Sequence, residues 1–183
     1  MSGSVGDNLA RASGVIASAG GGTILSVKSL KVTHAFSRTG TTPTQMSQFD
    51  MSFAATESDS KLLFQCWLST GSNTASTTGY DFYDVTNGAI VGAYADAAGS
   101  RQRVSWGSDV DFYHRYTQCG FGTWHEPGTT SSIDYTIRGA ADAADTLYIN
   151  RSGFDADTGI IEDQRAASVF IITEFAASAV TLI

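Results

Sequence analysis

Short segments in which apolar and polar residues alternate follow one another from Thr23 to the C-terminus of the chain. Gly, Ser, Thr, Asn and Asp separate these segments, and the whole chain contains only two prolines. A period of two is typical of half-buried β-strands, and many short strands in close order indicate a sandwich or jelly roll. We therefore expect an all-β body over residues 23–183, built as a jelly-roll-like antiparallel β-sandwich.

Three segments give the sharpest strand predictions. Phe49, Met51 and Phe53 alternate with polar residues, which indicates a strand with one buried face. Residues 62–68 are apolar at nearly every position, which predicts a central strand. Asn87-Gly88 predicts a hairpin turn, because both residues accept a positive φ. Further strands are expected at 23–36, 80–85, 102–106, 111–117, 120–126, 132–138, 146–151 and 168–175, with loops at 38–44 and 70–79.

Residues 1–22 form a separate N-terminal segment rich in Gly, Ala and Ser. Asp7 can cap a single helical turn by accepting the free N–H groups of residues 8–12. The run 17–22 contains three glycines and predicts a hinge, because glycine leaves the backbone unrestrained. So short a segment cannot pack a core alone. We expect a flexible arm that is either disordered or ordered against a neighbouring molecule.

The size and charge of the chain narrow the possible functions. A chain of 183 residues fits one domain that buries roughly 70% of its unfolded surface. The net charge of -7 argues against nucleic-acid binding, which needs a basic surface. Residues 1–49 contain four basic residues and one acidic residue, whereas the remainder contains seven basic and 17 acidic residues. This asymmetry either orients the chain on an acidic partner or is a chance feature.

Membrane insertion and secretion are not expected. No run of the sequence approaches 18 apolar residues, and the first residues lack the basic and apolar regions of a signal peptide. Without a secretory signal, the sequon Asn150-Arg151-Ser152 carries no weight. Cys66 and Cys119 lie in different predicted strands without a metal-binding spacing, so we expect two buried thiols.

Candidate catalytic and metal-binding residues are sparse. His34, His114 and His125 lack the spacing of metal ligands, and no pair of carboxylates suggests acid–base chemistry. We therefore expect neither an enzyme nor a bound cofactor. The acidic run 155–163 is either a solvated turn or a loose Ca²⁺ site, because it lacks the ligand offsets of an EF-hand. Four tyrosines could contribute to an exposed sugar-binding face: Tyr80, Tyr83, Tyr94 and Tyr113.

Several short motifs carry a resemblance to a known family. They are Val5–Ile16 (VGDNLARASGVI), Gly22–Val27 (GTILSV), Tyr148–Arg151 (YINR) with the acidic loop after it, and Ala166–Glu174 (AASVFIITE). With these motifs the chain resembles small phage virion proteins, which occur as capsid decoration (cement) proteins and as tips of tail fibres. Residues 70–79 and 106–126 do not match, and the tail 175–183 is longer and more apolar than expected. The resemblance implies a β-sandwich or jelly-roll body, usually in a homotrimer.

Two functions follow from this resemblance. The first is a decoration protein that binds the major capsid protein on the outside of the phage head and resides in the host cytoplasm during assembly. Its expected capsid contacts lie in the arm: Val5, Asp7, Asn8, Leu9, Arg11, Val15 and Ile16. The alternative is a tail-fibre tip that contacts host-surface glycan through the tyrosines named above. The lack of a fibre shaft favours the first. A glycan hydrolase would need two carboxylates about 5–9.5 Å apart, and the sequence nominates no such pair.

Overall fold

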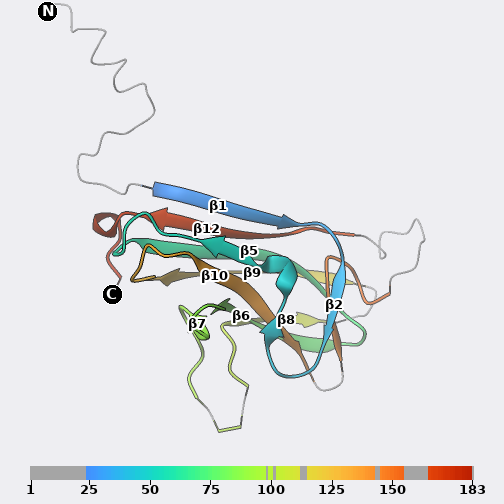
Figure 1. Cartoon of the computed structure of the whole chain (residues 1–183). Helices are drawn as coiled ribbons and strands as arrows, with labels where there is room; N and C mark the ends of the chain where they lie inside the picture. The colour runs from blue at the N-terminus through green and yellow to red at the C-terminus, as the bar shows by residue number, and fades with distance from the viewer. Residues whose placement is uncertain are drawn as a thin grey trace, which may run out of the picture.

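The computed structural model describes residues 24–97, 99–100, 102–111, 115–142, 145–154 and 165–182. Within these residues, twelve β-strands form two six-stranded antiparallel sheets (Figure 1). The two sheets pack face to face, so the predicted all-β sandwich is confirmed. No helix in the described ranges has the length and apolar character needed to cross a membrane.

The first sheet, sheet A, is built around β5 (Lys61–Ser72). β12 and β11 pair with β5 along one side, and β9 pairs with it along the other. β1 forms one edge of the sheet beside β12, and β2 pairs with β11. The remaining strands of sheet A are β1 (Ile24–Val32), β2 (Phe36–Thr39), β9 (Tyr116–His125), β11 (Thr146–Ile149) and β12 (Ser168–Phe175).

The second sheet, sheet B, has β10 (Ile133–Ala141) and β6 (Ser76–Asp84) at its centre. β10 also pairs with β3 and β4, while β6 pairs with β7 and β8. The other strands are β3 (Thr44–Gln45), β4 (Met51–Phe53), β7 (Ala89–Val91) and β8 (Trp106–Val110). Two 3-10 turns, Ser47–Phe49 and Ala177–Ala179, precede β4 and follow β12.

The core lies between the sheets and is rich in aromatic side chains. Phe64 of β5 has no exposed surface, and its ring lies 4.9 Å from that of Tyr135 and 5.5 Å from that of Phe82. Tyr135 and Phe82 belong to sheet B, so these rings join the two layers. Burying each side chain contributes roughly 1.5–3 kcal/mol of hydrophobic free energy, which makes this cluster a main source of cohesion.

Several strand predictions are confirmed. Met51 and Phe53 are buried in β4, whereas Phe49 is buried in the 3-10 turn before it, so the predicted strand is shorter than expected. Residues 62–68 lie in the central strand of sheet A. β6 and β7 form the predicted hairpin, in which Gly88 has a φ of 69°. Asn87 differs from the expectation, since its φ is not positive. Its N–H group instead donates to Asp84 Oδ1 at 2.8 Å.

The loop predicted at 70–79 is wrong, because β5 continues to Ser72 and β6 begins at Ser76. The hydroxyl-rich sequence suits strands here because its side chains find partners inside the sandwich. Thr70 Oγ1 donates to the Thr117 carbonyl at 3.2 Å, and Thr78 Oγ1 donates to the Ser108 carbonyl at 3.1 Å. The strands predicted at 102–106 and 111–117 are displaced, with β8 and β9 beginning at 106 and 116.

Some of the sequence predictions cannot be compared with the structure. Residues 1–22, with all seven proposed capsid contacts, lie outside the described residues. The same holds for Tyr113, His114 and the acidic run 155–163. These predictions stay open.

Candidate interaction surface

The outer face of sheet B is polar and partly covered. Arg138 of β10 and Asp81 of β6 form a bidentate ion pair, with Nε–Oδ1 and Nη2–Oδ2 distances of 2.7 Å. Burial raises the pKa of Asp81, and Arg138 opposes that rise. The guanidinium carbon of Arg138 lies 4.0 Å from the centre of the Tyr83 ring. The Val104 side chain lies directly over Gly79 and covers the sheet there, since a Cβ added at Gly79 would be only 2.6 Å from Val104 Cγ1.

The outer face of sheet A is apolar and lacks such a cover among the described residues. Alternate residues of β5 point away from the core, since Leu62, Phe64 and Cys66 are buried between the sheets. Strand pairing places the outward residues of four neighbouring strands in three rows. The rows, running β1, β12, β5, β9, are Val27-Thr173-Leu63-Trp124, Ser29-Ile171-Gln65-Gly122 and Lys31-Val169-Trp67-Gly120. We call these twelve positions the sheet A outer face.

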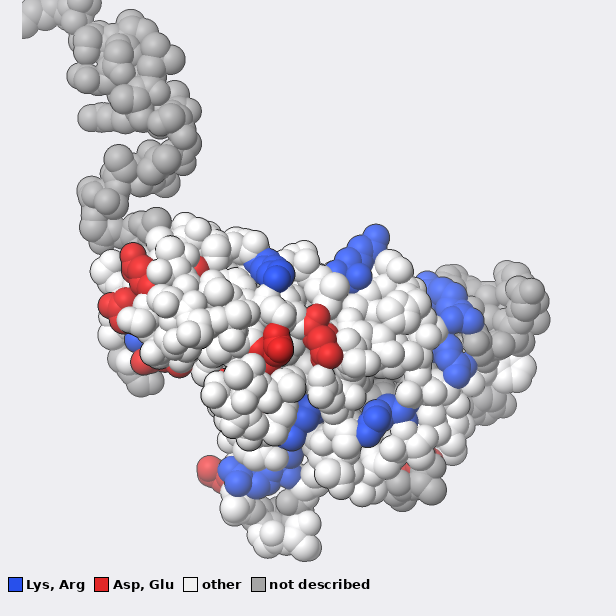
Figure 2. Space-filling view, in the orientation of Figure 1, with Lys and Arg blue, Asp and Glu red and all other residues white. Residues whose placement is uncertain are grey.

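This face differs from the rest of an acidic chain. None of its twelve positions holds Asp or Glu, and Lys31 is its one charged residue. Val27 and Trp67 are 59% and 50% exposed, although both side chains are large and apolar. In the view of Figure 2, charged residues form small separate groups on a largely uncharged surface. Exposed apolar surface without charge is typical of surfaces that bind another molecule.

A hollow of about 350 Å³ interrupts the sheet A outer face beside Trp67. It exists because β9 carries Gly120 and Gly122, which have no side chains, next to β5. The indole leans toward Gly120, since a Cβ added there would lie 3.2 Å from Trp67 Cδ1. Gln65 and Gln118 supply polar groups at its border. The face therefore combines a projecting ring with an adjacent depression.

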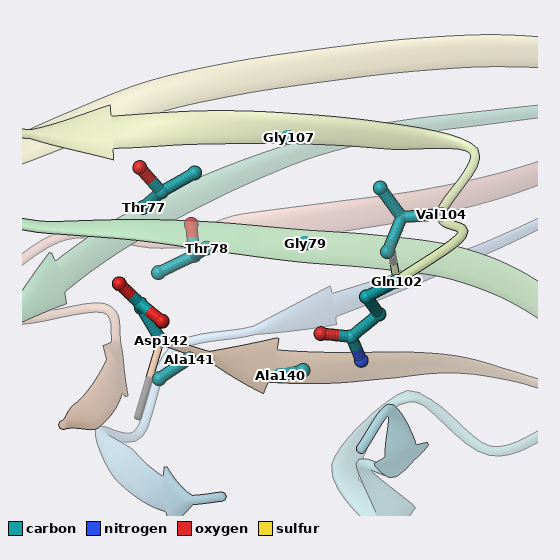
Figure 3. Close-up of a pocket in the computed structure, with 9 residues that line it drawn as sticks. All are labelled: Thr77, Thr78, Gly79, Gln102, Val104, Gly107, Ala140, Ala141 and Asp142. Carbon is teal, nitrogen blue, oxygen red and sulfur yellow. The ribbon is translucent and has the colours of Figure 1, made fainter. Parts of the chain in front are cut away.

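A second hollow, of about 220 Å³, lies on sheet B between β6, β8 and β10 (Figure 3). Small residues form its middle, with Thr77 and Asp142 toward one end and Gln102 and Val104 toward the other. Asp142 is the one ionisable side chain among the described lining residues. A single carboxylate does not supply the acid–base pair that glycoside hydrolysis requires.

The other titratable candidates are dispersed. His34 is exposed in the link between β1 and β2, so the strand predicted at 23–36 does not continue through it. His125 is partly buried, and burial lowers its pKa, which favours the neutral ring. Across the described ranges, no three His, Cys, Asp or Glu side chains gather as metal ligands would. Cys66 is buried as predicted, whereas Cys119 is only partly buried; both thiols are free.

The predicted tyrosine face does not form as expected. Tyr80 was assigned to it wrongly, because its side chain is fully buried and its hydroxyl donates to Thr78 Oγ1 at 2.9 Å. Tyr83 and Tyr94 are half-buried, each against an arginine. Sequence reasoning missed Trp67, an aromatic side chain that is 50% exposed. The available signal was the pair Gly120 and Gly122 on β9, which leaves space without side chains beside Trp67.

Comparison with known proteins gives no family. No family model matches the chain, and no curated protein matches it in sequence. Two solved structures similar in fold are a chain from the infectious bursal disease virus Gx strain and one from the infectious bursal disease virus VP2 subviral particle. Their TM-scores are 0.40 and 0.39 at 11% identity, and the matches cover 82% and 84% of this chain. They cover only 40% and 42% of the viral chains, and likeness at this level carries no argument about function.

Proposed function

We propose that this chain is a structural protein of a phage particle, and specifically a decoration protein on the outside of the head. The sheet A outer face is the observation that carries the proposal. It places Val27, Leu63, Ile171 and Trp67 on one exposed surface without a single carboxylate. Exposing apolar side chains to water is unfavourable in free energy, and contact with another protein removes them from water. The phage-like motifs at both ends of the chain agree with this assembly role.

In this proposal the arm binds the major capsid protein. Val5, Leu9, Val15 and Ile16 would enter seams between capsid subunits, and each buried side chain would contribute roughly 1.5–3 kcal/mol before ordering costs. Asp7, Asn8 and Arg11 would supply the polar contacts beside them. Three copies around a threefold axis would bind the head more tightly than one copy, because the second and third arms bind at high effective concentration once the first is bound.

A binding experiment with purified phage heads tests this role. The full chain and a variant lacking residues 1–16 are mixed with undecorated heads and sedimented together. We expect the full chain to coat the heads and the truncated chain to remain in solution while keeping its thermal unfolding temperature. Ser13→Ala is a matched control within the arm. Equal occupancy of heads by the full and truncated chains would show that the arm is not the anchor.

Cryo-electron microscopy of the intact particle decides between head and tail. The proposal expects density for this chain on the head. Density at a fibre tip, together with labelling of host cells by the purified chain, would establish the receptor-binding alternative. The structure favours that alternative less, since Tyr80 is buried and Tyr83 and Tyr94 are half-buried.

A further inference from the structure

We propose that the sheet A outer face binds a second copy of this chain. This inference goes beyond the threefold cluster of the proposed function, because a self-complementary face pairs two copies about a twofold axis. It is tested on the purified protein without phage heads, so the two proposals can fail separately.

The size of the face suits the centre of a protein interface. Neighbouring strands lie about 4.8 Å apart, and residues on one face of a strand repeat about every 6.8 Å. Four strands and three rows therefore cover roughly 20 Å by 20 Å with their side chains, on the order of 400 Å². A stable interface of ordinary size buries about 800 Å² on each partner. The face supplies about half of that area, and its apolar part consists of Val27, Leu63, Trp67, Trp124, Val169 and Ile171. The surrounding strand ends would supply the rest.

Charge favours a second copy in this position. Two copies that each carry a net charge of -7 repel one another, so a contact between them is favoured where carboxylates are absent. The sheet A outer face avoids this repulsion, because Lys31 is its one charged residue. Lys31 also lies on the edge strand β1, where its ammonium group can remain hydrated at the rim.

The shape of the face is self-complementary. Trp67 projects from β5 with 50% of its surface exposed, and the hollow of about 350 Å³ beside it opens over Gly122, since the indole itself lies against Gly120. When a surface meets a second copy of itself, each projection needs a depression on the same surface to receive it. The Trp67 indole of one copy would enter the hollow of the other. Buried tryptophans are among the residues that contribute most to interfaces.

The association is measured by sedimentation equilibrium on the full chain, over micromolar to millimolar concentrations. We expect the wild type to show an even multiple of 19.3 kDa, because the face joins copies in pairs. Val27→Glu combined with Trp67→Glu places carboxylates against carboxylates and should weaken association by at least about 100-fold. The control Val85→Glu with Phe154→Glu adds the same charge at apolar positions that are 37% and 41% exposed elsewhere, and should leave the mass unchanged.

A milder variant covers the case in which the double variant fails to fold. Gly122→Ala partly fills the hollow, and its Cβ would make an ordinary contact of 3.5 Å with the Phe64 carbonyl oxygen. It should weaken association by about tenfold with unchanged circular dichroism. A wild type that stays monomeric would overturn the proposal, as would equal masses for the wild type and both face variants. If deleting residues 1–22 increases acrylamide quenching of Trp67 in a monomer, with Trp67→Phe as the reference, the arm covers the face and the proposal is wrong.

Discussion

Glu174 of β12 and Thr56, in the loop after β4, are joined by two hydrogen bonds. The Thr56 N–H group donates to Oε1 at 2.6 Å, and its hydroxyl donates to Oε2 at 2.9 Å. Ser26 and Ser60 donate to the same carboxylate at 2.7 and 2.8 Å. The buried charge is therefore surrounded by donors. It ties β1 and β12 to the segment that leads from sheet B back to sheet A.

Glu174→Gln should make stability depend less on pH. Burial alone raises the pKa of Glu174, but the hydrogen bonds from Ser26, Ser60 and Thr56 outweigh it and lower the pKa. A carboxylate with a lowered folded-state pKa stabilises the fold above its unfolded value, about 4.5, and loses this effect as the pH falls through the folded-state pKa. The substitution should lower the free energy of unfolding by about 2–3 kcal/mol near pH 7.

Urea unfolding at about pH 7 and about pH 3 measures this dependence. The difference between wild type and Glu174→Gln should shrink on acidification. Glu126→Gln serves as the control, because Glu126 is 55% exposed and its ion pair with Lys61 contributes at most about 1 kcal/mol. A constant difference between the two pH values would contradict the assigned role of the Glu174 carboxylate.

Asn150 should be sensitive to substitution through both its backbone and its side chain. It has a φ of 63° and no exposed surface. Its amide donates to the carbonyls of Val32 and His34 at 2.8 and 3.0 Å and accepts from Ser168 Oγ at 2.7 Å. Asn150→Gly keeps the backbone conformation but loses these bonds, and should cost about 2–3 kcal/mol. Asn150→Ala should cost about 1 kcal/mol more, because alanine resists a positive φ.

Denaturant unfolding of the two Asn150 variants separates the contributions. Equal stability of Asn150→Gly and wild type would mean that the side-chain hydrogen bonds contribute nothing. The burial of Asn150 also explains why its sequon is not an accessible glycan acceptor in the folded chain.

Gly71 and Gly122, both in sheet A, should differ in how much an added methyl group lowers the free energy of unfolding. At Gly71 a Cβ would lie 2.4 Å from the Arg151 carbonyl oxygen, so the backbone itself must move. Gly71→Ala should therefore lower the free energy of unfolding by about 2 kcal/mol or more. At Gly122 the nearest atom would be 3.5 Å away, and Gly122→Ala should stay within about 0.5 kcal/mol of the wild type. Denaturant unfolding measures the stability of both variants. Equal free energies of unfolding for Gly71→Ala and Gly122→Ala would contradict the prediction.

The two thiols should differ in reactivity. Cys66 is 1% exposed, and burial raises its pKa; burial also raises the pKa of the partly buried Cys119. Because the thiolate is the reacting form, Cys119 should be modified slowly in the native protein and Cys66 only after unfolding. A colorimetric disulfide reagent measures both rates, and Cys119→Ser isolates Cys66. Rapid modification of Cys66 in the folded Cys119→Ser variant would contradict its burial.

Strand locations were predictable because alternation is a local signal. The phase of Phe49, Met51 and Phe53 indicates which side is buried without reference to any partner strand. The pairing of strands was not predictable in this way. β5 pairs with β9, β11 and β12, which lie far along the chain. The sequence of β5 does not indicate which strands will pair with it.

The candidate surface was the hardest part to predict. Residues 62–68 are apolar on both sides, so hydrophobicity did not separate the exposed Trp67 from the buried Phe64 and Cys66. The expectation that Tyr80 is exposed is wrong. Tyr80 and Phe82 are two residues apart in one strand, so their side chains point to the same side of the sheet, and the apolar Phe82 indicated that this side is buried. Composition alone directed attention to the tyrosines.

An apolar outer face also removes a common safeguard against misfolding. Sliding β5 by one residue exchanges its two sides, and most sandwiches oppose that error because it buries polar groups. In this chain the exchange would bring Leu63 and Trp67 inside together with Gln65, so Gln65 is the one polar side chain among these three that opposes it. The carboxylate of Glu174 and the amide of Asn150 find their donors and acceptors in only one of them. The hydrogen bonds of Glu174 and Asn150 therefore contribute to selecting the correct alignment of β5, in addition to the apolar core.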